Sequence, residues 1–310
     1  MTGAGGRLGR AVVTALEEAP FSGPFGPIAW SRAIWDLDAP DGIDRLLDRD
    51  RPEVIVHCAA WTDVDACARE PDLALRRNGD ATGVLARAAA ARGVDLIVVS
   101  TNEVFDGRRT DGAGYAPDDP TNPINPYGAS KLAGEVAARD AFGEATARGR
   151  RGAALGIART AWLYGPPGND FPSKILAAAE RTAAAGEPLR LVADETGSPS
   201  YTVDVAEAIV ELIGAAALEG THHLVNGGSA TRAGWARELL HQARVEVATQ
   251  DVPAATWPRV STPPAWAVLD PTPLPGGEPL RPWTAALADY LPTLRRQLAA
   301  AAAAAAGGAR

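Results

Sequence analysis

Tyr127 and Lys131 stand four residues apart within residues 122–135, whose sequence is NPINPYGASKLAGE. Positions i and i+4 of a helix share one face, so a helix here would place the ammonium beside the phenol. A nearby positive charge lowers the pKa of a phenol from about 10, which lets the phenol act as a general acid near neutral pH. The spacing predicts a tyrosine acid assisted by a lysine, with two ordinary exposed helix residues as the plainer alternative.

Lys131 is one of two lysines among 30 basic side chains, and all the others are arginine. A compact ammonium can hold a ribose hydroxyl and lower the pKa of the phenol at once, whereas the planar fork of arginine fits that task poorly. The use of lysine here therefore favours a catalytic role.

Ser100 and Thr101 end the apolar stretch VDLIVVST, residues 94–101. Ligands of open α/β sheets bind at the carboxyl ends of the strands. A hydroxyl at such an end can donate a hydrogen bond to a substrate carbonyl oxygen, so Thr101 is the third candidate for the catalytic set.

Glycines at positions 3, 6 and 9 directly precede the helical pattern RAVVTALEEA. This spacing allows a tight turn and lets a pyrophosphate approach a helix N-terminus, although a plain loop accounts for it equally well. Ser31 and Arg32 follow the next predicted strand. An arginine there would pair with a 2′-phosphate, so we expect NADPH, with NADH as the alternative cofactor and a simple surface role as the alternative for Arg32.

Short apolar runs alternate with longer helical patterns over the first half of the chain. The predicted strands cover residues 24–30, 52–60, 94–101 and 153–165, and the predicted helices cover residues 39–50, 72–93 and 130–142. This alternation, with strands apolar on both faces, predicts an α/β fold with a doubly wound, Rossmann-type parallel sheet.

We expect an NAD(P)-binding domain over residues 1–165. Residues 166–295 are richer in proline and glycine and are expected to form mainly a smaller, substrate-binding C-terminal domain with segments that return to the first. Residues 296–310 are rich in alanine, which is compatible with an extension of the last helix, but nothing gives them a face to pack, so we expect a disordered tail.

The glycine motif should follow a strand, yet only Met1 precedes Thr2. We therefore expect the first strand to be truncated and the chain to be a shortened form of a longer one. The alternative is that the chain begins here and another segment fills the central place in the sheet.

The formal net charge of −8 and the pI near 5.1 argue against nucleic acid and anionic membranes as partners. No apolar run approaches the length of a membrane span. The two cysteines, Cys58 and Cys67, and four scattered histidines form no metal-binding spacing. These features favour a cytoplasmic protein without a structural metal.

Together these stretches resemble the extended short-chain dehydrogenases/reductases, and most closely the dTDP-4-dehydrorhamnose reductase family. The matching stretches run in the family's order over nearly the whole chain and include TGAGGRLG, VVSTNEVFDG, NPYGASKLAGE, RTAWLYGPPGNDF and GSPSYTVDVAEAI. The resemblance implies Thr101, Tyr127 and Lys131 as the catalytic set. It implies cofactor contacts, shared with Tyr127 and Lys131, from Gly3, Gly6, Arg7, Leu8, Arg32, Asp36, Leu37, Ala59, Ala60 and Thr62.

On the substrate side the resemblance implies Thr101, Asn102, Glu103 and Trp162. The chain departs from the family at Glu103, where an aromatic residue is usual, and at Pro263 and Ala267, where arginine and serine are expected. A charge in the sugar pocket puts the identity of the sugar in question.

The sequence thus predicts NADPH-dependent reduction of the 4-keto group of a nucleotide-linked deoxysugar. One alternative is a ketoreductase for another nucleotide sugar. Another is a non-catalytic binding subunit that resembles the methionine adenosyltransferase β subunit. Hydride transfer needs no metal, but the resemblance allows accessory magnesium at an interface and a homodimer.

Overall fold

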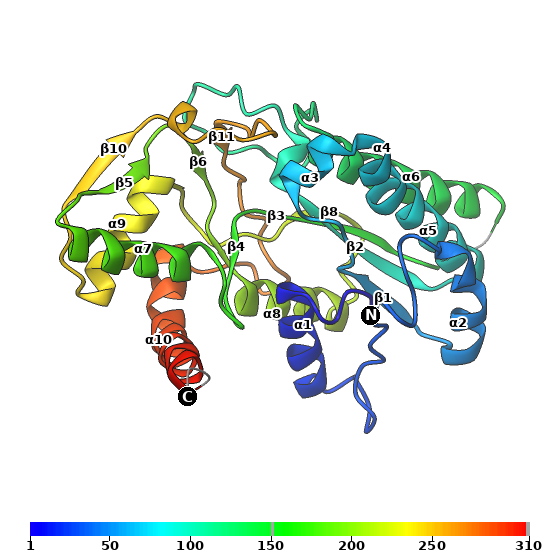
Figure 1. Ribbon diagram of the computed structural model, residues 1–310. Coiled ribbons are helices and arrows are strands. Elements are labelled where there is room, and N and C mark those ends of the chain that lie inside the picture. The colour runs from blue at the N-terminus through cyan, green and yellow to red at the C-terminus, as the bar shows by residue number, and fades with distance from the viewer. Residues whose placement is uncertain (150–151, 308–310) are drawn as a thin grey trace.

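Four strands pair in parallel in the computed structural model, which describes residues 1–149 and 152–307. Their order across the sheet is β1 (Val54–His57), β2 (Asp95–Thr101), β3 (Leu155–Thr160) and β8 (Gly220–His223). Helices lie on both faces of this sheet, as Figure 1 shows. The predicted doubly wound α/β fold is confirmed.

Alternate residues of one strand pack into opposite helix layers, because successive side chains of a strand point to opposite faces. Leu96 and Val98 join the core beneath α2 (Ile43–Asp50), α5 (Ala81–Arg92) and α6 (Pro126–Ala147). Ile97 between them joins the core of α1 (Arg7–Glu18) and α8 (Thr202–Gly214). This explains why the strands are apolar on both faces.

Met1 and Thr2 hold the central place in the sheet without forming a regular strand. Thr2 bridges Trp30 on one side and His57 on the other, both in parallel. The Thr2 N–H donates to the Val56 carbonyl at 3.0 Å, and the Trp30 N–H donates to the Met1 carbonyl at 2.8 Å. The glycine loop therefore begins from two buried residues that are hydrogen-bonded to both neighbours.

The helix predicted over residues 72–93 is divided into three elements in the structure. These are α4 (Pro71–Ala74), the π-helix η2 (Leu75–Asp80) and α5. A short helix, α3 (Val64–Arg69), precedes them. The backbone of η2 lies close to α6, since a Cβ placed on Gly134 would come within 2.5 Å of the Asn78 carbonyl oxygen. The absence of a side chain at Gly134 thus sets the distance between these two helices.

Much of the second half of the chain lies to the left of the sheet in Figure 1, around α7 (Phe171–Ala185), α9 (Arg232–Ala243) and α10 (Trp283–Gly307). Their core is largely aromatic, with Tyr164, Trp235 and Tyr290 fully buried. The small sheets pair β5 (Leu189–Val192) with β10 (Thr249–Val252), β4 (Leu163–Tyr164) with β7 (Ser200–Tyr201), and β6 (Thr196–Gly197) with both β9 (Ala230–Thr231) and β11 (Trp266–Ala267). Single 3-10 turns are η1 (Pro40–Gly42), η3 (Asn102–Val104) and η4 (Ala254–Thr256).

The chain returns to the first sheet between these elements, because α8 packs with α1 and β8 pairs with β3. The boundaries at residues 165 and 295 stay predictions. None of the helices in the described ranges is both long and apolar enough to cross a membrane.

The alanine-rich tail differs from its prediction. Helix α10 continues to Gly307, so residues 296–307 are helical rather than disordered, and residues 308–310 lie outside the described part of the chain. Alanine has the highest helix propensity, and the packed first turns of α10 supply the nucleus from which a helix extends.

Two glycines of α6 give a matched test of this packing. Gly134→Ala should lower the free energy of unfolding by about 1–3 kcal/mol, because its methyl group would press on the Asn78 carbonyl. A Cβ on Gly143 would meet open space, so Gly143→Ala should have the opposite effect. It should stabilise the protein by about 0.5–1 kcal/mol, because alanine loses less conformational freedom in a helix than glycine does. Urea unfolding measures both, and equal effects of the two changes would contradict the close approach.

Candidate active site

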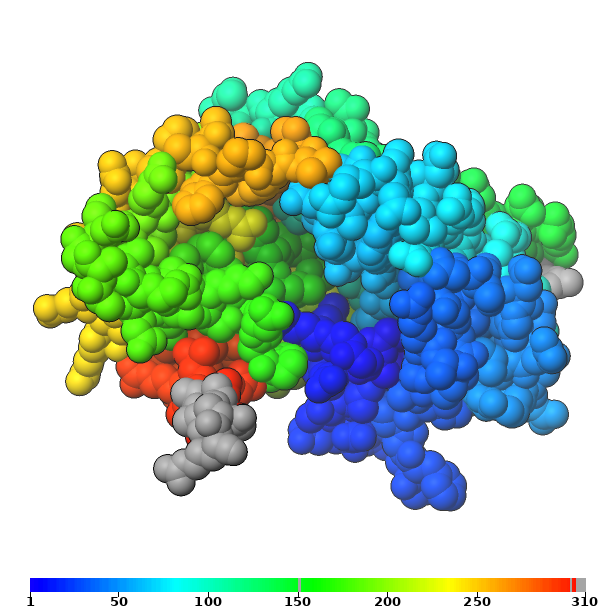
Figure 2. All heavy atoms as spheres, in the orientation of Figure 1, coloured from blue at the N-terminus to red at the C-terminus, as the bar shows by residue number. Residues whose placement is uncertain are grey.

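Two adjoining cavities lie at the carboxyl ends of the sheet strands, where ligands bind in such folds. The outer cavity has a volume of about 250 Å³ and the inner cavity about 440 Å³, and both are bordered by Gly3, Gly6, Cys58 and Ala60. Figure 2 shows this side of the molecule hollowed between the green segment of α7 and the blue and cyan first part of the chain.

Every residue predicted for the site borders one of the two cavities. The outer cavity is bordered by Gly3, Gly6, Arg32, Asp36, Leu37, Ala59 and Ala60. The inner cavity is bordered by Gly3, Gly6, Arg7, Leu8, Ala60, Thr62, Thr101, Asn102, Glu103, Tyr127, Lys131 and Trp162. The structure thus brings together residues from six separate stretches of the sequence.

The glycine loop has the features that a pyrophosphate requires. Gly3 adopts a φ of +68°, and a Cβ there would lie 2.5 Å from the Ala59 nitrogen. The Gly6 N–H donates to the Gly3 carbonyl at 2.9 Å, after which α1 begins at Arg7. No side chain caps the start of α1 and its first turn carries no acidic residue, so the positive end of the helix faces the cavity.

The three catalytic candidates meet in the inner cavity. Thr101 is the last residue of β2, and Tyr127 and Lys131 lie in the first two turns of α6. Asn125 fixes the start of α6, because its side chain accepts a hydrogen bond from the Gly128 N–H at 2.8 Å. The predicted helical arrangement of the tyrosine and the lysine is confirmed.

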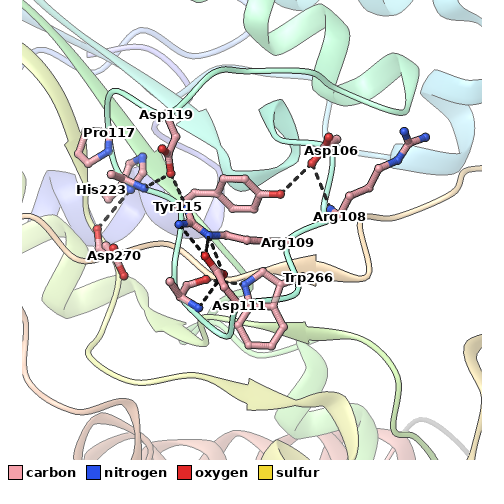
Figure 3. Close-up of polar contacts among 12 residues, drawn as sticks. Asp106, Arg108, Arg109, Asp111, Tyr115, Pro117, Asp119, His223, Trp266 and Asp270 are labelled. Carbon is pink, nitrogen blue, oxygen red and sulfur yellow. Dashed lines mark hydrogen bonds and ion pairs between the residues drawn. The ribbon is translucent and has the colours of Figure 1, made fainter.

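A tightly bonded loop connects β2 to α6 and so joins Thr101 to Tyr127. In Figure 3 the Tyr115 hydroxyl points to Asp106 and donates to it at 2.8 Å. Arg109 lies between two carboxylates, with nitrogen–oxygen distances of 2.9 Å to Asp111 and 2.7 Å to Asp119. These contacts hold the connection in one conformation outside the cavity.

The pKa of Tyr127 is raised, whereas the sequence predicted that Lys131 would lower it. Burial is the main cause, and the Glu103 carboxylate adds to it, while a hydrogen bond with Thr101 opposes both. Burial disfavours the charged phenolate, and this effect exceeds the benefit expected from the lysine. Tyr127 therefore remains protonated, as a proton donor must be.

Lys131 is almost fully buried, and burial lowers its pKa to about 8. The Glu135 carboxylate, one helical turn further along α6, opposes this shift. In return the charge of Lys131 contributes to the lowered pKa of His57, which burial reduces to about 3. The ammonium is thus a poorly solvated charge at the cavity wall.

Asn78 supports the site from behind, and the sequence analysis did not predict this role. From the π-helix η2 its side chain accepts from the Trp61 N–H at 2.7 Å and donates to the Trp61 carbonyl at 3.0 Å. It also donates to the Ser130 hydroxyl at 3.0 Å, and Ser130 donates to the Tyr127 carbonyl at 2.7 Å. One buried amide thereby links the loop after β1 to the catalytic helix.

Arg232 is a second residue that the sequence missed. Its guanidinium lies 3.5 Å from the ring centroid of Trp162, and it forms an ion pair with Glu195 at 3.7 Å. Arg232 also borders a third cavity of about 940 Å³, together with Phe171, Lys174 and Arg259. Arg232 lies 70 residues after Trp162 in the sequence, and no local pattern predicts that the two side chains meet. Only the tertiary fold brings α9 next to Trp162.

The fold and the site define a dinucleotide-binding protein of the short-chain dehydrogenase/reductase class. The family model described as RmlD substrate binding domain matches residues 1–296. A dTDP-4-dehydrorhamnose reductase of Streptomyces griseus is 34% identical over 95% of this chain and 93% of its own. The chain therefore belongs to the dTDP-4-dehydrorhamnose reductase family.

Two further proteins show the range of this likeness. A dTDP-4-keto-6-deoxy-D-glucose reductase of Streptomyces niveus is 34% identical, with 95% of this chain and 96% of that protein covered. The crystal structure of dTDP-4-dehydrorhamnose reductase from Bacillus anthracis in complex with NADP has a TM-score of 0.79 and 30% identity, and covers 94% of this chain and 96% of that one.

The buried ammonium gives the site a testable pH dependence. Binding a ribose hydroxyl to Lys131 favours its charged form, whose pKa in the free protein is about 8. Affinity for NADP⁺ should stay constant below that value and fall as the pH rises through it, by up to about ten-fold per pH unit. Titration calorimetry between about pH 6 and about pH 9.5 measures this.

Lys131→Met is the control for this prediction. It should bind NADP⁺ more weakly at neutral pH and lose the pH dependence, because no ammonium remains to titrate. A native profile that is flat through pH 8, or one that the variant retains, would contradict the assignment.

Proposed function

We propose that this protein reduces the 4-keto group of a nucleotide-linked deoxysugar with NADPH as the hydride donor. The observation that carries the proposal is the convergence of Thr101, Tyr127 and Lys131 in the inner cavity, beside the glycine loop. The family relatives named above act on substrates of this class. NADPH supplies the hydride when bound. Residues of the chain bind the two reactants and supply the proton.

Tyr127 acts as the general acid. Burial and the Glu103 carboxylate raise its pKa, so its phenol carries a proton at neutral pH. It gives this proton to the oxygen of the substrate as negative charge develops there. The Thr101 hydroxyl donates a hydrogen bond to the same oxygen, and its place at the end of β2 keeps it fixed.

Lys131 holds the ribose of the cofactor and places a positive charge near the phenolate that Tyr127 becomes. The charge matters more after proton transfer than before it, because the phenolate is the species that burial destabilises. Gly3, Gly6, Arg7 and Leu8 would hold the pyrophosphate at the start of α1. The other residues proposed for the cofactor, which border the two cavities, would hold the rest of it: Arg32, Asp36, Leu37, Ala59, Ala60 and Thr62.

The third cavity is suited to the nucleoside diphosphate of the substrate. Lys174, Arg190, Arg232 and Arg259 border it and supply positive charge for the phosphates. Arg232 stacks on Trp162 at the junction with the inner cavity, so a sugar beside Trp162 would continue into this space. The arrangement favours a sugar linked to a nucleotide over a free sugar.

Glu103 separates this chain from the usual family pattern at the sugar end. Its Oε2 accepts from the Asn125 side chain at 2.7 Å, and burial raises its pKa. A carboxyl group here offers two acceptor oxygens to a sugar substituent, whereas an aromatic side chain offers at most the single hydroxyl of a tyrosine. This favours a 4-keto sugar other than the rhamnose precursor as the second candidate substrate.

The described part of the chain shows no cluster of side chains that would bind magnesium. Within residues 1–149 and 152–307 no group of three or more His, Cys, Asp or Glu side chains is placed to hold a metal ion.

Tyr127→Phe tests the acid. Turnover of dTDP-linked 4-keto-6-deoxysugars, followed by loss of NADPH absorbance, should fall about 100-fold or more, since general-acid catalysis typically contributes that much. Binding of NADP⁺ should change less than about two-fold, because Lys131 remains to hold the ribose.

The matched control is Tyr201→Phe, which removes a phenol outside all three cavities and should leave turnover near the native value. Near-native turnover of Tyr127→Phe would remove the tyrosine from the mechanism. Tight NADP⁺ binding by the native protein without turnover of any keto sugar would favour the non-catalytic binding subunit instead.

A further inference from the structure

Two arginines and two aspartates form a chain of ion pairs at the rim of the outer cavity, which three of the four residues border. Arg32 pairs with Asp36 and with Asp38, both at 3.1 Å. Arg77 pairs with Asp38 through two hydrogen bonds of 2.6 and 2.7 Å. The Asp38 carboxylate therefore lies between two guanidinium groups.

Arg77 is the more firmly placed of the two cations. It comes from the π-helix η2, and its guanidinium lies 4.8 Å from the ring centroid of Trp61. Its side chain is 21% exposed, whereas that of Arg32 is 74% exposed. Arg77, Trp61 and Arg32 all border the outer cavity, so both cations are available to the same space.

A phosphate monoester binds the same hydrogen-bond donors and positive charges as the Asp38 carboxylate does. Arginine binds either group through two parallel N–H donors, and two guanidinium groups around one anion are typical of phosphate recognition. A phosphate at the rim would also meet the negative charge of Asp38 at short range. The two anions would therefore compete for the same donors.

We propose that Arg77 and Arg32 form the subsite for the adenosine 2′-phosphate, and that Asp38 competes with this phosphate for them and so sets the preference between NADPH and NADH. The inference rests on the proposed function only in taking a nicotinamide dinucleotide as the ligand. Asp38 holds the two arginines in place when no phosphate is bound, and the phosphate binds by displacing it.

Asp36 completes this arrangement for the cofactor without the phosphate. It borders the outer cavity and accepts hydrogen bonds from Arg32 and from the Asp38 N–H at 3.1 Å each. A carboxylate in this place suits a ribose 2′-OH. The rim thus has a partner for either cofactor, and the discrimination between them is modest because Asp38 offsets part of the gain from the phosphate.

Titration calorimetry with NADP⁺ and NAD⁺, and with 2′,5′-ADP and AMP as fragments, tests this without any sugar substrate. Asp38→Asn keeps the size of the side chain and removes its charge. It should tighten binding of NADP⁺ and 2′,5′-ADP by about three- to ten-fold, since the competing anion is gone, and change NAD⁺ and AMP by less than about two-fold.

Arg77→Gln should have the opposite effect and weaken NADP⁺ and 2′,5′-ADP by about ten-fold or more, again with little change for NAD⁺. Asp48→Asn is the matched control, because Asp48 pairs with an arginine, Arg92, that borders none of the three cavities, whereas the arginines paired with Asp38 border the outer cavity. It should leave all four affinities unchanged.

An unchanged ratio of NADP⁺ to NAD⁺ affinity in Asp38→Asn, or weaker NADP⁺ binding, would overturn the inference, as would equal losses for both cofactors in Arg77→Gln. These results would leave the proposed reaction intact, since the keto-sugar assay decides that separately. Failure of the native protein to bind either dinucleotide would overturn both.

Discussion

Helix α6 is held between two backbones with no room for a side chain, and the site depends on this constraint. A Cβ on Gly128 would overlap the carbonyl oxygen of Glu103, and a Cβ on Gly134 would come within 2.5 Å of that of Asn78. One contact sets α6 against the turn that follows Thr101, and the other sets it against the π-helix. Tyr127 and Lys131 project from the same turns, so their distance from the strand end is fixed by the backbone.

Part of this could be predicted from the sequence, and the reason is that the signals are local. The pairing of Tyr127 with Lys131 follows from helical periodicity, and the place of Thr101 follows from the end of an apolar strand. The glycine motif likewise predicts its own turn, which Gly3 confirms with its positive φ. Each of these inferences needs only a few consecutive residues.

What escaped prediction depends on contacts between distant segments. The π-helix around Asn78 forms where α6 packs against it, and Arg232 reaches Trp162 only through the placement of α9. The direction of the pKa shift of Tyr127 was wrong for the same reason, since burial is a property of the folded chain and has no local signature. The helical continuation of α10 shows the opposite error, in which a strong local propensity was given too little weight.

The ion pairs around the cavities give a second reason why residue 131 is a lysine and not an arginine. Several arginines that border the three cavities are held by carboxylates, as Arg7 is by Asp170, Arg77 by Asp38 and Arg259 by Glu195. The broad guanidinium fork has donors to spare, so it can bind a carboxylate while it faces a ligand.

Lys131 differs, because no carboxylate lies within ion-pair distance of it in the described part of the chain. The nearest helical acid, Glu135, is itself bonded by Arg159 at 2.8 Å. The ammonium therefore forms no ion pair that a ligand would have to displace, and burial leaves its charge weakly screened by solvent. An arginine here would require a carboxylate of its own, and that negative charge beside Tyr127 would oppose the phenolate that proton transfer creates.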